Sequence, residues 1–368
     1  MKLQAIELRR IAMPLVRPFR TSFGVQSSRD VLLVRVVTDV SEGWGECVAL
    51  AAPVYSSEYV EGAHAVLRDH LVPRLLAEPA VTARTVAPRL ADVLGHRMAK
   101  AAVETAVLDA ELRAHDMSLG TYLGAVRTEV ECGVSVGIAA SIDELLAEVG
   151  GYVDQGYRRI KLKIEPGWDV EPVRAVREAF GPALRLQVDA NTAYDAATSA
   201  HLEALDEFGL LLIEQPFPED DLHKHAVLAR RISTPVCLDE SIVSARAVVD
   251  AVRQGACSIV NIKAGRMGGY LESVRVHDVC EALGVPVWCG GMLETGIGRA
   301  ANVALAALPN FRLPGDTSAS DRYYAEDITE PFVLRDGMLP VPTGPGMGVT
   351  PRPDVLSALT TSVETLKP

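Results

Sequence analysis

The sequence predicts an α/β protein: a TIM-type (β/α)₇β-like barrel with an α+β capping domain formed by the N-terminal part and the C-terminal tail. Two observations predict this fold. From about residue 132, short apolar runs alternate with helical patterns, as in the βαβ units that build a parallel sheet. The chain also has 368 residues, more than the roughly 250 that one such barrel needs, so a second unit is expected.

Seven short apolar runs mark the strands of the predicted barrel. They are CGVSV (132–136), RIKLKI (159–164), LRLQVD (184–189), LLLIE (210–214), PVCLD (235–239), SIVNIK (258–263) and VPVWC (285–289). An eighth, weaker run fits at FRLPGD (311–316), and eight units favour a closed barrel over an open sheet. Helical patterns lie between the runs, at 169–180, 219–232, 244–254, 269–283 and 298–308.

The rest of the chain has a different pattern. We expect residues 1–125 to form the capping domain, 126–325 the barrel, and 326–368 a Pro- and Gly-rich segment that returns to the cap. Within the cap, the pattern predicts antiparallel strands at 3–13 and 31–38, then helices at 57–76, 82–95 and 99–115.

The composition excludes several classes of function. Lysine and arginine total 36 against 48 acidic residues, so the net charge is −12, and nucleic acid or an anionic membrane surface is a poor partner. No apolar run reaches the roughly 18 residues of a membrane helix. Glu7, Arg9 and Arg10 interrupt the N-terminal apolar stretch, so no signal peptide is expected. The six cysteines form no CxxC pair and are expected as buried thiols in the reducing cytoplasm.

Charged residues close five consecutive strands of the predicted barrel. The intervals between them are 26, 25, 25 and 24 residues, one βα unit each, and the residues are Lys163, Asp189, Glu214, Asp239 and Lys263. The carboxyl ends of the strands hold the active site in this fold, so these side chains are expected to converge there. A single Asp at a strand end is ordinarily a helix cap. Five charges in succession, with lysines on strands buried on both faces, favour a catalytic site instead.

The types of these residues indicate metal-assisted proton transfer. Three carboxylates that converge repel one another unless a cation joins them, and oxygen ligands alone suit Mg²⁺, with Mn²⁺ or another divalent ion as a substitute. No histidine accompanies them, which argues against zinc. Positive neighbours and partial desolvation lower the pKa of a lysine, so a neutral amine can act as a base. A metal opposite such a base can stabilise the enediolate that forms when the proton α to a carboxylate leaves.

Short motifs around these residues resemble those of a known family. Lys161-Leu162-Lys163, Asp189-Ala190-Asn191, Glu214-Gln215-Pro216, Asp239-Glu240-Ser241 and Asn261-Ile262-Lys263 resemble the muconate-lactonising-enzyme subgroup of the enolase superfamily. Residues 290–296 (GGMLETG) and 315–321 (GDTSASD) look like those of o-succinylbenzoate synthases that also act as N-acylamino acid racemases. The resemblance covers nearly the whole chain.

The resemblance implies a role for each part of the site. Lys163 and Lys263 would lie on opposite faces of the substrate α-carbon, and Asp189, Glu214 and Asp239 would bind Mg²⁺. The substrate would be a small-molecule carboxylate, and the protein a homo-oligomer. The implied substrate-binding residues are Phe19, Phe23, Tyr55, Ser135, Lys161, Asn191, Gly291, Met292 and Leu293. A mobile loop near residues 17–24 would close the site, although a hairpin with core aromatics explains the same residues.

Two reactions fit this arrangement: N-acylamino acid racemisation, and the dehydration that yields o-succinylbenzoate in menaquinone synthesis. Arg266 follows Lys263 by three residues, and we hypothesise that its charge depresses the pKa of Lys263. Dipeptide epimerase and muconate cycloisomerase remain alternatives, although Asp316-Thr317-Ser318 departs from the Asp-x-Asp typical of dipeptide epimerases. The alternative outside enzymes is a non-catalytic protein on the same fold, but no expected ligand or lysine is missing.

Overall fold

The seven apolar runs form the seven strands of one parallel sheet in the computed structural model, which describes residues 1–368. The strand order is β11-β10-β9-β8-β7-β6-β5, so strands that are consecutive in sequence are neighbours in space. Their bounds are β5 (Gly133–Val136), β6 (Arg159–Lys163), β7 (Leu186–Asp189), β8 (Ile213–Glu214), β9 (Val236–Leu238), β10 (Ile259–Ile262) and β11 (Val287–Cys289). The predicted fold class is confirmed.

The eighth predicted run joins the two edges of this sheet without forming a regular strand. Phe311 makes an isolated parallel bridge with Val287 of β11, and Gly315 makes one with Cys132, directly before β5. The Gly133 N–H donates to the Gly315 carbonyl at 2.7 Å. Pro314 has no N–H to donate, which explains why the ladder is interrupted at this position.

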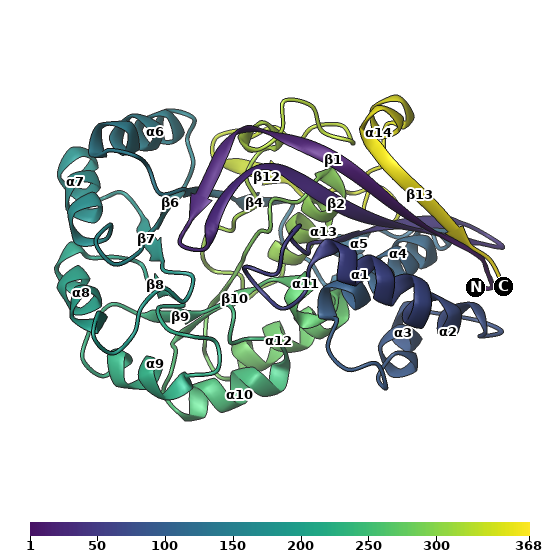
Figure 1. Ribbon diagram of the computed structural model, residues 1–368, viewed down its shortest axis with the longest axis horizontal. Coiled ribbons are helices and arrows are strands. Elements are labelled where there is room, and N and C mark those ends of the chain that lie inside the picture. Colours follow the sequence, from purple (N-terminus) through teal and green to yellow (C-terminus); the bar gives the residue numbers. More distant parts are fainter.

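Helices follow the strands and lie on the outside of the curved sheet (Figure 1). Side chains cap several of their N-termini; for example, Ser141 and Ser244 accept hydrogen bonds from Glu144 and Ala247. The helices are α6 (Ile142–Asp154), α7 (Val170–Phe180), α8 (Ser199–Ala204), α9 (Leu222–Ala229), α10 (Ala245–Arg253), α11 (Ala264–Met267), α12 (Tyr270–Ala282) and α13 (Gly296–Ala306), with short 3₁₀ turns at η2 (Leu205–Phe208) and η3 (Ser320–Arg322).

The capping unit is a four-stranded antiparallel sheet with helices against it. The sheet has the order β13-β1-β2-β3, from β1 (Leu3–Thr21), β2 (Gly24–Thr38), β3 (Glu42–Cys47) and β13 (Thr360–Leu366). Because β13 pairs with β1, the two chain ends lie side by side (Figure 1). The helical segments are α1 (Val60–Val66), the π-helical η1 (Leu67–Leu71), α2 (Val72–Leu76), α3 (Ala83–Arg89), α4 (Arg97–Ala114) and α5 (Leu119–Leu123).

The remaining C-terminal elements connect the two units. β12 (Met338–Pro340) pairs with β4 (Glu129–Glu131), and α14 (Pro353–Leu359) precedes β13. Helix α3 is shorter than the predicted 82–95: it passes through Pro88 and ends at Arg89, because Leu90 leaves the helical conformation (φ −106°, ψ 9°). None of the helices is long and apolar enough to cross a membrane. All six cysteines are buried and free, as expected.

Two glycines of β3 allow α4 to pack directly on the capping sheet. A Cβ atom at Gly43 would lie 2.2 Å from the Ala110 nitrogen, and one at Gly45 would lie 2.0 Å from the Ala102 carbonyl oxygen. Any side chain at either position would therefore push the helix away from the sheet.

The β1–β2 hairpin extends from the cap to the carboxyl ends of β6 and β7 (Figure 1). Near its tip, the Arg20 carbonyl accepts a hydrogen bond from the Ile138 N–H at 2.9 Å. Arg20 also forms an ion pair with Glu165 at 3.0 Å, and the Ser22 hydroxyl lies 3.4 Å from the Ala190 carbonyl oxygen. Both strands are longer than predicted, because their pairing continues to this tip.

Candidate active site

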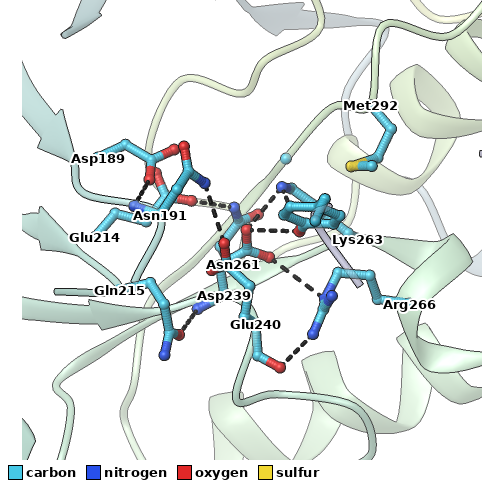
Figure 2. Close-up of polar contacts among 12 residues, drawn as sticks. Asp189, Asn191, Glu214, Gln215, Asp239, Glu240, Asn261, Lys263, Arg266 and Met292 are labelled. Atoms are coloured by element: carbon cyan, nitrogen blue, oxygen red, sulfur yellow. Dashed lines mark hydrogen bonds and ion pairs between the residues drawn. The ribbon is translucent and has the colours of Figure 1, made fainter. Parts of the chain in front are cut away.

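The charged residues at the strand ends lie on one face of the curved sheet. Lys163 pairs with Asp189, and Asp189 pairs with Glu214, as direct neighbours across parallel strands. Glu214 lies opposite Cys237, so Asp239 lies two residues further along its strand. An even offset keeps a side chain on the same face. The predicted convergence is therefore present, and Figure 2 shows the side chains from neighbouring strand ends gathered in one place.

Apolar side chains fill the space beneath this charged layer. Leu212, Cys237, Ile259 and Trp288 form a buried cluster of their own, separate from the two larger cores. The Lys161 ammonium lies 4.8 Å from the centre of the Trp288 ring. This packed apolar layer excludes water from one side of the site. The charged side chains must therefore be neutralised by ion pairs with one another.

The two predicted catalytic lysines are each paired with a predicted metal ligand. The Lys163 Nζ lies 2.6 Å from Asp189 Oδ2, and the Lys263 Nζ lies 2.7 Å from Asp239 Oδ2. Lys263 also donates to the Tyr55 hydroxyl at 3.0 Å. Three strands, β7 to β9, separate the strands that carry the lysines, so the two amines approach the site from opposite sides.

Lys161 lies between three carboxylates. Its Nζ is 2.5 Å from Asp316 Oδ2 and 3.3 Å from both Asp189 Oδ2 and Glu214 Oε2. Arg159 contacts the other oxygen of Asp316 at 2.8 Å. Neither Arg159 nor Asp316 was predicted as a site residue. Asp316 ends the eighth apolar run just as the other acids end theirs, and this signal could have identified it.

Burial and neighbouring charges shift the pKa values of the carboxyl groups in different directions. Burial, followed by repulsion from Asp189, raises the pKa of Glu214 well above its usual range. Burial also opposes ionisation of Asp189, but the ammonium groups of Lys163 and Lys161 outweigh it and hold its pKa below the usual value. Burial and the charge of Asp239 raise the pKa of Glu240 to about 8.

The pKa of Lys263 is shifted upward, opposite to the direction expected from the sequence. Burial lowers the pKa, but the adjacent Asp239 carboxylate and Tyr55 outweigh it. Arg266 contacts the partners of Lys263: its Nε lies 3.9 Å from Asp239 Oδ1, and its guanidinium lies 5.2 Å from the centre of the Tyr55 ring. The proposed tuning of Lys263 by Arg266 stays a prediction.

Amide side chains hold the carboxylates in position. Asn261 donates to Glu214 Oε1 at 2.7 Å, and the Gln215 side-chain oxygen accepts from the Asp239 N–H at 3.0 Å. Asn191 accepts from Lys163 at 2.6 Å. It also donates to Glu240 at 3.0 Å (Figure 2). The motifs contained these amides, but only the structure shows what Asn261 and Gln215 contact.

A small cavity of about 40 Å³ opens among these residues. All nine predicted substrate-binding residues line it, together with Lys163 and Lys263. The further lining residues, which the sequence analysis did not select, are Thr21, Gln26, Leu50, Asp316 and Tyr323. A larger cavity of about 700 Å³ lies between α3, α4 and α12, but it contains none of the predicted site residues. The converging lysines and carboxylates therefore identify the smaller cavity as the candidate site.

The two aromatic residues of the hairpin tip belong both to its packing and to the cavity wall. Phe19 is buried, with its ring edge-on to Tyr323 at 6.2 Å between centres. Phe23 packs against Tyr55 at 5.7 Å. The segment that resembles a closing loop is thus an ordered hairpin tip in this structure, and its mobility stays a prediction.

The carboxylates suit a divalent ion in chemistry but are not grouped as a finished metal site. No three Asp, Glu, His or Cys side chains converge closely enough to hold an ion as they stand. However, Glu214 Oε2 and Asp239 Oδ1 are buried and make no hydrogen bond, and an all-oxygen set of this charge is what Mg²⁺ prefers. The donor set therefore fits Mg²⁺, and an ion would compete with the lysine ammonium groups for these oxygens.

Comparisons with known proteins cover nearly the whole chain. Residues 5–124 match the model for the mandelate racemase / muconate lactonizing enzyme N-terminal domain, and residues 144–355 match the enolase C-terminal domain-like model. An N-succinylamino acid racemase from Amycolatopsis sp is 67% identical over 362 residues, 98% of each chain. An o-succinylbenzoate synthase from Geobacillus kaustophilus is 48% identical over 94% of this chain and 92% of its own. A crystal structure of an enolase superfamily member from Listeria innocua has a TM-score of 0.95 at 40% identity, covering 100% of this chain and 99% of that one.

Proposed function

The chain belongs to the mandelate racemase / muconate lactonizing enzyme family of the enolase superfamily, and from this premise we propose that it removes the proton α to the carboxylate of a small acid. The substrates we propose are N-acylamino acids, which it would racemise, and the o-succinylbenzoate precursor, which it would dehydrate. The observation that carries the proposal is the pair of buried lysines, Lys163 and Lys263, which face one cavity from opposite sides with three carboxylates between them.

In racemisation the two lysines exchange roles. One lysine, as the neutral amine, accepts the α-proton from one face of the substrate. The other, as the ammonium, delivers a proton to the opposite face. The enzyme returns to its starting charge, with the proton now on the other lysine, and is ready for the opposite enantiomer.

In the dehydration one lysine suffices for both proton transfers. Lys163 would accept the α-proton and then donate it to the departing hydroxide, which leaves as water from the same face. Lys263 would stay protonated and offset the negative charge of the enediolate. Both reactions share the first step, so a single site can serve both. The dehydration would place the enzyme in menaquinone synthesis, and a cytoplasmic location stays a prediction.

Asp189, Glu214 and Asp239 are the residues we propose as ligands of Mg²⁺, or of Mn²⁺ in its place. When bound, the ion would supply positive charge that stabilises the enediolate. Asn261 and Gln215 fix the orientation of Glu214 and the backbone of Asp239, as the second layer of a metal site does.

Substrate entry requires the cavity to enlarge. Its volume of about 40 Å³ is close to that of one water molecule and far below that of an N-acylamino acid. The hairpin tip that carries Phe19 and Phe23 is the segment we propose to move, because it forms one side of the cavity and its ion pair with the barrel mouth, between Arg20 and Glu165, lies at the surface.

One observation argues against a dipeptide epimerase. A free ammonium on the substrate would need an unpaired carboxylate near the eighth run. Asp316 is already bound by Lys161 on one oxygen and Arg159 on the other. Its pKa lies below the usual range: burial opposes this, but the two cations outweigh it.

Incubation in D₂O tests the proposal. With Mg²⁺ and N-succinyl- or N-acetyl-methionine, we expect deuterium at the α-carbon and conversion of either enantiomer to the racemate, measured by mass spectrometry and chiral chromatography. A parallel assay follows loss of the cyclohexadiene precursor for the dehydration. If neither N-acyl substrate exchanges its α-proton and the precursor is not dehydrated, the proposal is wrong.

A further inference from the structure

The segment from Gly290 to Thr295 forms one wall of the cavity and holds an unusual backbone conformation. Gly291, Met292 and Leu293 line the cavity. Leu293 has a φ of +58°, in the left-handed region that a residue with a bulky side chain rarely adopts. Such a conformation persists only where surrounding contacts hold it, so the residues that hold this wall also set the shape of the site.

Residues of the barrel make some of the contacts that hold this wall in its conformation. The Glu294 side chain accepts from the Met292 N–H at 2.8 Å and from the Asn302 amide at 3.0 Å. The Tyr324 hydroxyl donates to the Leu293 carbonyl at 2.5 Å. These contacts fix the middle of the wall but not its end at Thr295.

The end of the wall is held by Glu46, which belongs to β3 of the capping sheet. Glu46 is 7% exposed, and its Oε2 accepts from the Thr295 hydroxyl at 2.7 Å and from the Gly298 N–H at 3.1 Å. The Thr295 N–H also donates to Glu46 at 3.1 Å. A Cβ atom at Gly298 would lie 3.0 Å from this carboxylate, so the glycine allows the close approach.

We propose that Glu46 is a positioning residue of the active site: it fastens the cavity wall 291–295 to the capping domain, so that the shape of the acyl pocket depends on how the cap sits on the barrel. The assignment of this wall to the acyl group rests on the proposed function. The fastening itself rests on the contacts alone.

The cap segment that follows Glu46 reaches the other side of the same cavity. Val48 packs on Gly265, where an added Cβ atom would lie 2.3 Å from its Cγ2. Leu50 lines the cavity, and Tyr55 accepts from Lys263 at 3.0 Å. Residues 46–55 of the cap thus contact both the wall and a proposed catalytic lysine. Glu46 supplies the hydrogen bonds that attach this stretch to the barrel.

Hydrogen exchange of the full-length protein tests the fastening without any substrate. In Glu46→Ala we expect the amides of residues 292–298 to exchange about tenfold faster or more, because the variant loses all three hydrogen bonds to the wall and a factor of ten corresponds to about one of them. Glu46→Gln, which keeps one acceptor oxygen, should give a smaller increase. Unchanged exchange of this segment in a folded Glu46→Ala protein would overturn the proposal.

Glu104→Ala is the matched control. Glu104 is also a buried carboxylate of the cap, 2% exposed, and it accepts from a barrel helix N-terminus, the Leu271 N–H, at 3.1 Å, but it does not touch the wall. We expect wild-type exchange at 292–298 in this variant; an equal increase there would mean that any loss of cap contact loosens the wall. Should Glu46→Ala not fold, Thr295→Val removes the hydroxyl from the barrel side and Thr295→Ser restores it. We expect faster exchange at 292–298 in Thr295→Val and exchange close to the wild type in Thr295→Ser.

Kinetics then test the link to specificity. We expect Glu46→Ala to change the ratio of kcat/KM for N-succinyl- against N-acetyl-methionine by about threefold or more, mainly through KM, while Glu104→Ala keeps the wild-type ratio. An unchanged ratio together with a loosened wall would contradict the specificity role. If the wild-type enzyme acts on neither substrate, the proposed function is wrong, and the exchange experiment still decides whether Glu46 fastens the wall.

Discussion

Among single residues, Lys161 shows how the site tolerates several buried charges. It is 2% exposed and lies within 3.3 Å of three carboxylates, one of which is shared with Arg159. A buried ammonium without such partners would cost several kcal/mol. The charges of the site therefore stabilise one another as a network. Removing one of them leaves its partners buried without full compensation.

Arg266 provides the first test at this scale. It contacts Asp239 and the Tyr55 ring, both partners of Lys263. We predict that Arg266→Gln impairs racemisation more than dehydration, by roughly tenfold, because only racemisation requires Lys263 to act as a neutral base. The measurement is kcat/KM for both reactions on the same preparation, and equal losses in the two activities would contradict the hypothesis.

The sequence predicts some site residues much better than others. Asp189, Glu214 and Asp239 recur at one βα unit, a regularity that only a shared barrel edge explains. Arg159 was missed because it begins its strand rather than ending it. Glu46 was missed because it lies on the capping sheet, 249 residues before Thr295, and only the docking of the two units brings them together.

At the scale of elements, regular spacing predicts the strand order but not the stagger between strands. The interval from Glu214 to Asp239 equals the one before it, yet Glu214 pairs with Cys237 instead. Residues at the same sequence interval can therefore lie at different depths along a barrel, as the shear of a closed sheet requires. The spacing indicated the face and the end of the sheet at which these side chains gather.

A contact between helices of the two units predicts how folding stability depends on pH. Glu104 of α4 accepts from the N-terminus of α12, and burial raises its pKa from 4.5 to about 7. The folded state therefore holds a proton that the unfolded state releases between these values, so the contribution of Glu104 to stability is highest below pH 4.5 and falls as the pH rises to 7. This rise of the Glu104 pKa from 4.5 to about 7 corresponds to about 3 kcal/mol.

Glu104→Gln, a neutral side chain of the same shape, removes this contribution. We expect it to match the wild type near pH 4 and to be more stable than the wild type near pH 8, measured as the denaturant midpoint. The exposed Glu42→Gln, on β3, is the control and should follow the wild type at both values. A constant difference between Glu104→Gln and the wild type across this range would show that Glu104 does not change its charge there.

At the scale of the whole molecule, the capping unit completes a site that the barrel alone does not enclose. Phe19, Phe23, Leu50 and Tyr55 come from the cap, and they line the cavity opposite the barrel lysines. The cap itself needs both chain ends, because β13 pairs with β1. The residues beyond those of a minimal barrel thus shape the pocket, which agrees with the expectation that the second unit closes the barrel mouth.

If Lys163 and Lys263 act on opposite faces of one α-carbon, as we propose, each controls the exchange of one enantiomer, and enantiomer-specific exchange tests this most directly. The measurement is α-deuterium incorporation from D₂O into separate D- and L-enantiomers of N-succinyl-methionine by the Lys163→Ala and Lys263→Ala variants. We predict that each variant loses exchange of one enantiomer by about 10²-fold or more and that the two variants lose opposite enantiomers. Loss of the same enantiomer in both variants, or undiminished exchange of both in either one, would contradict the account.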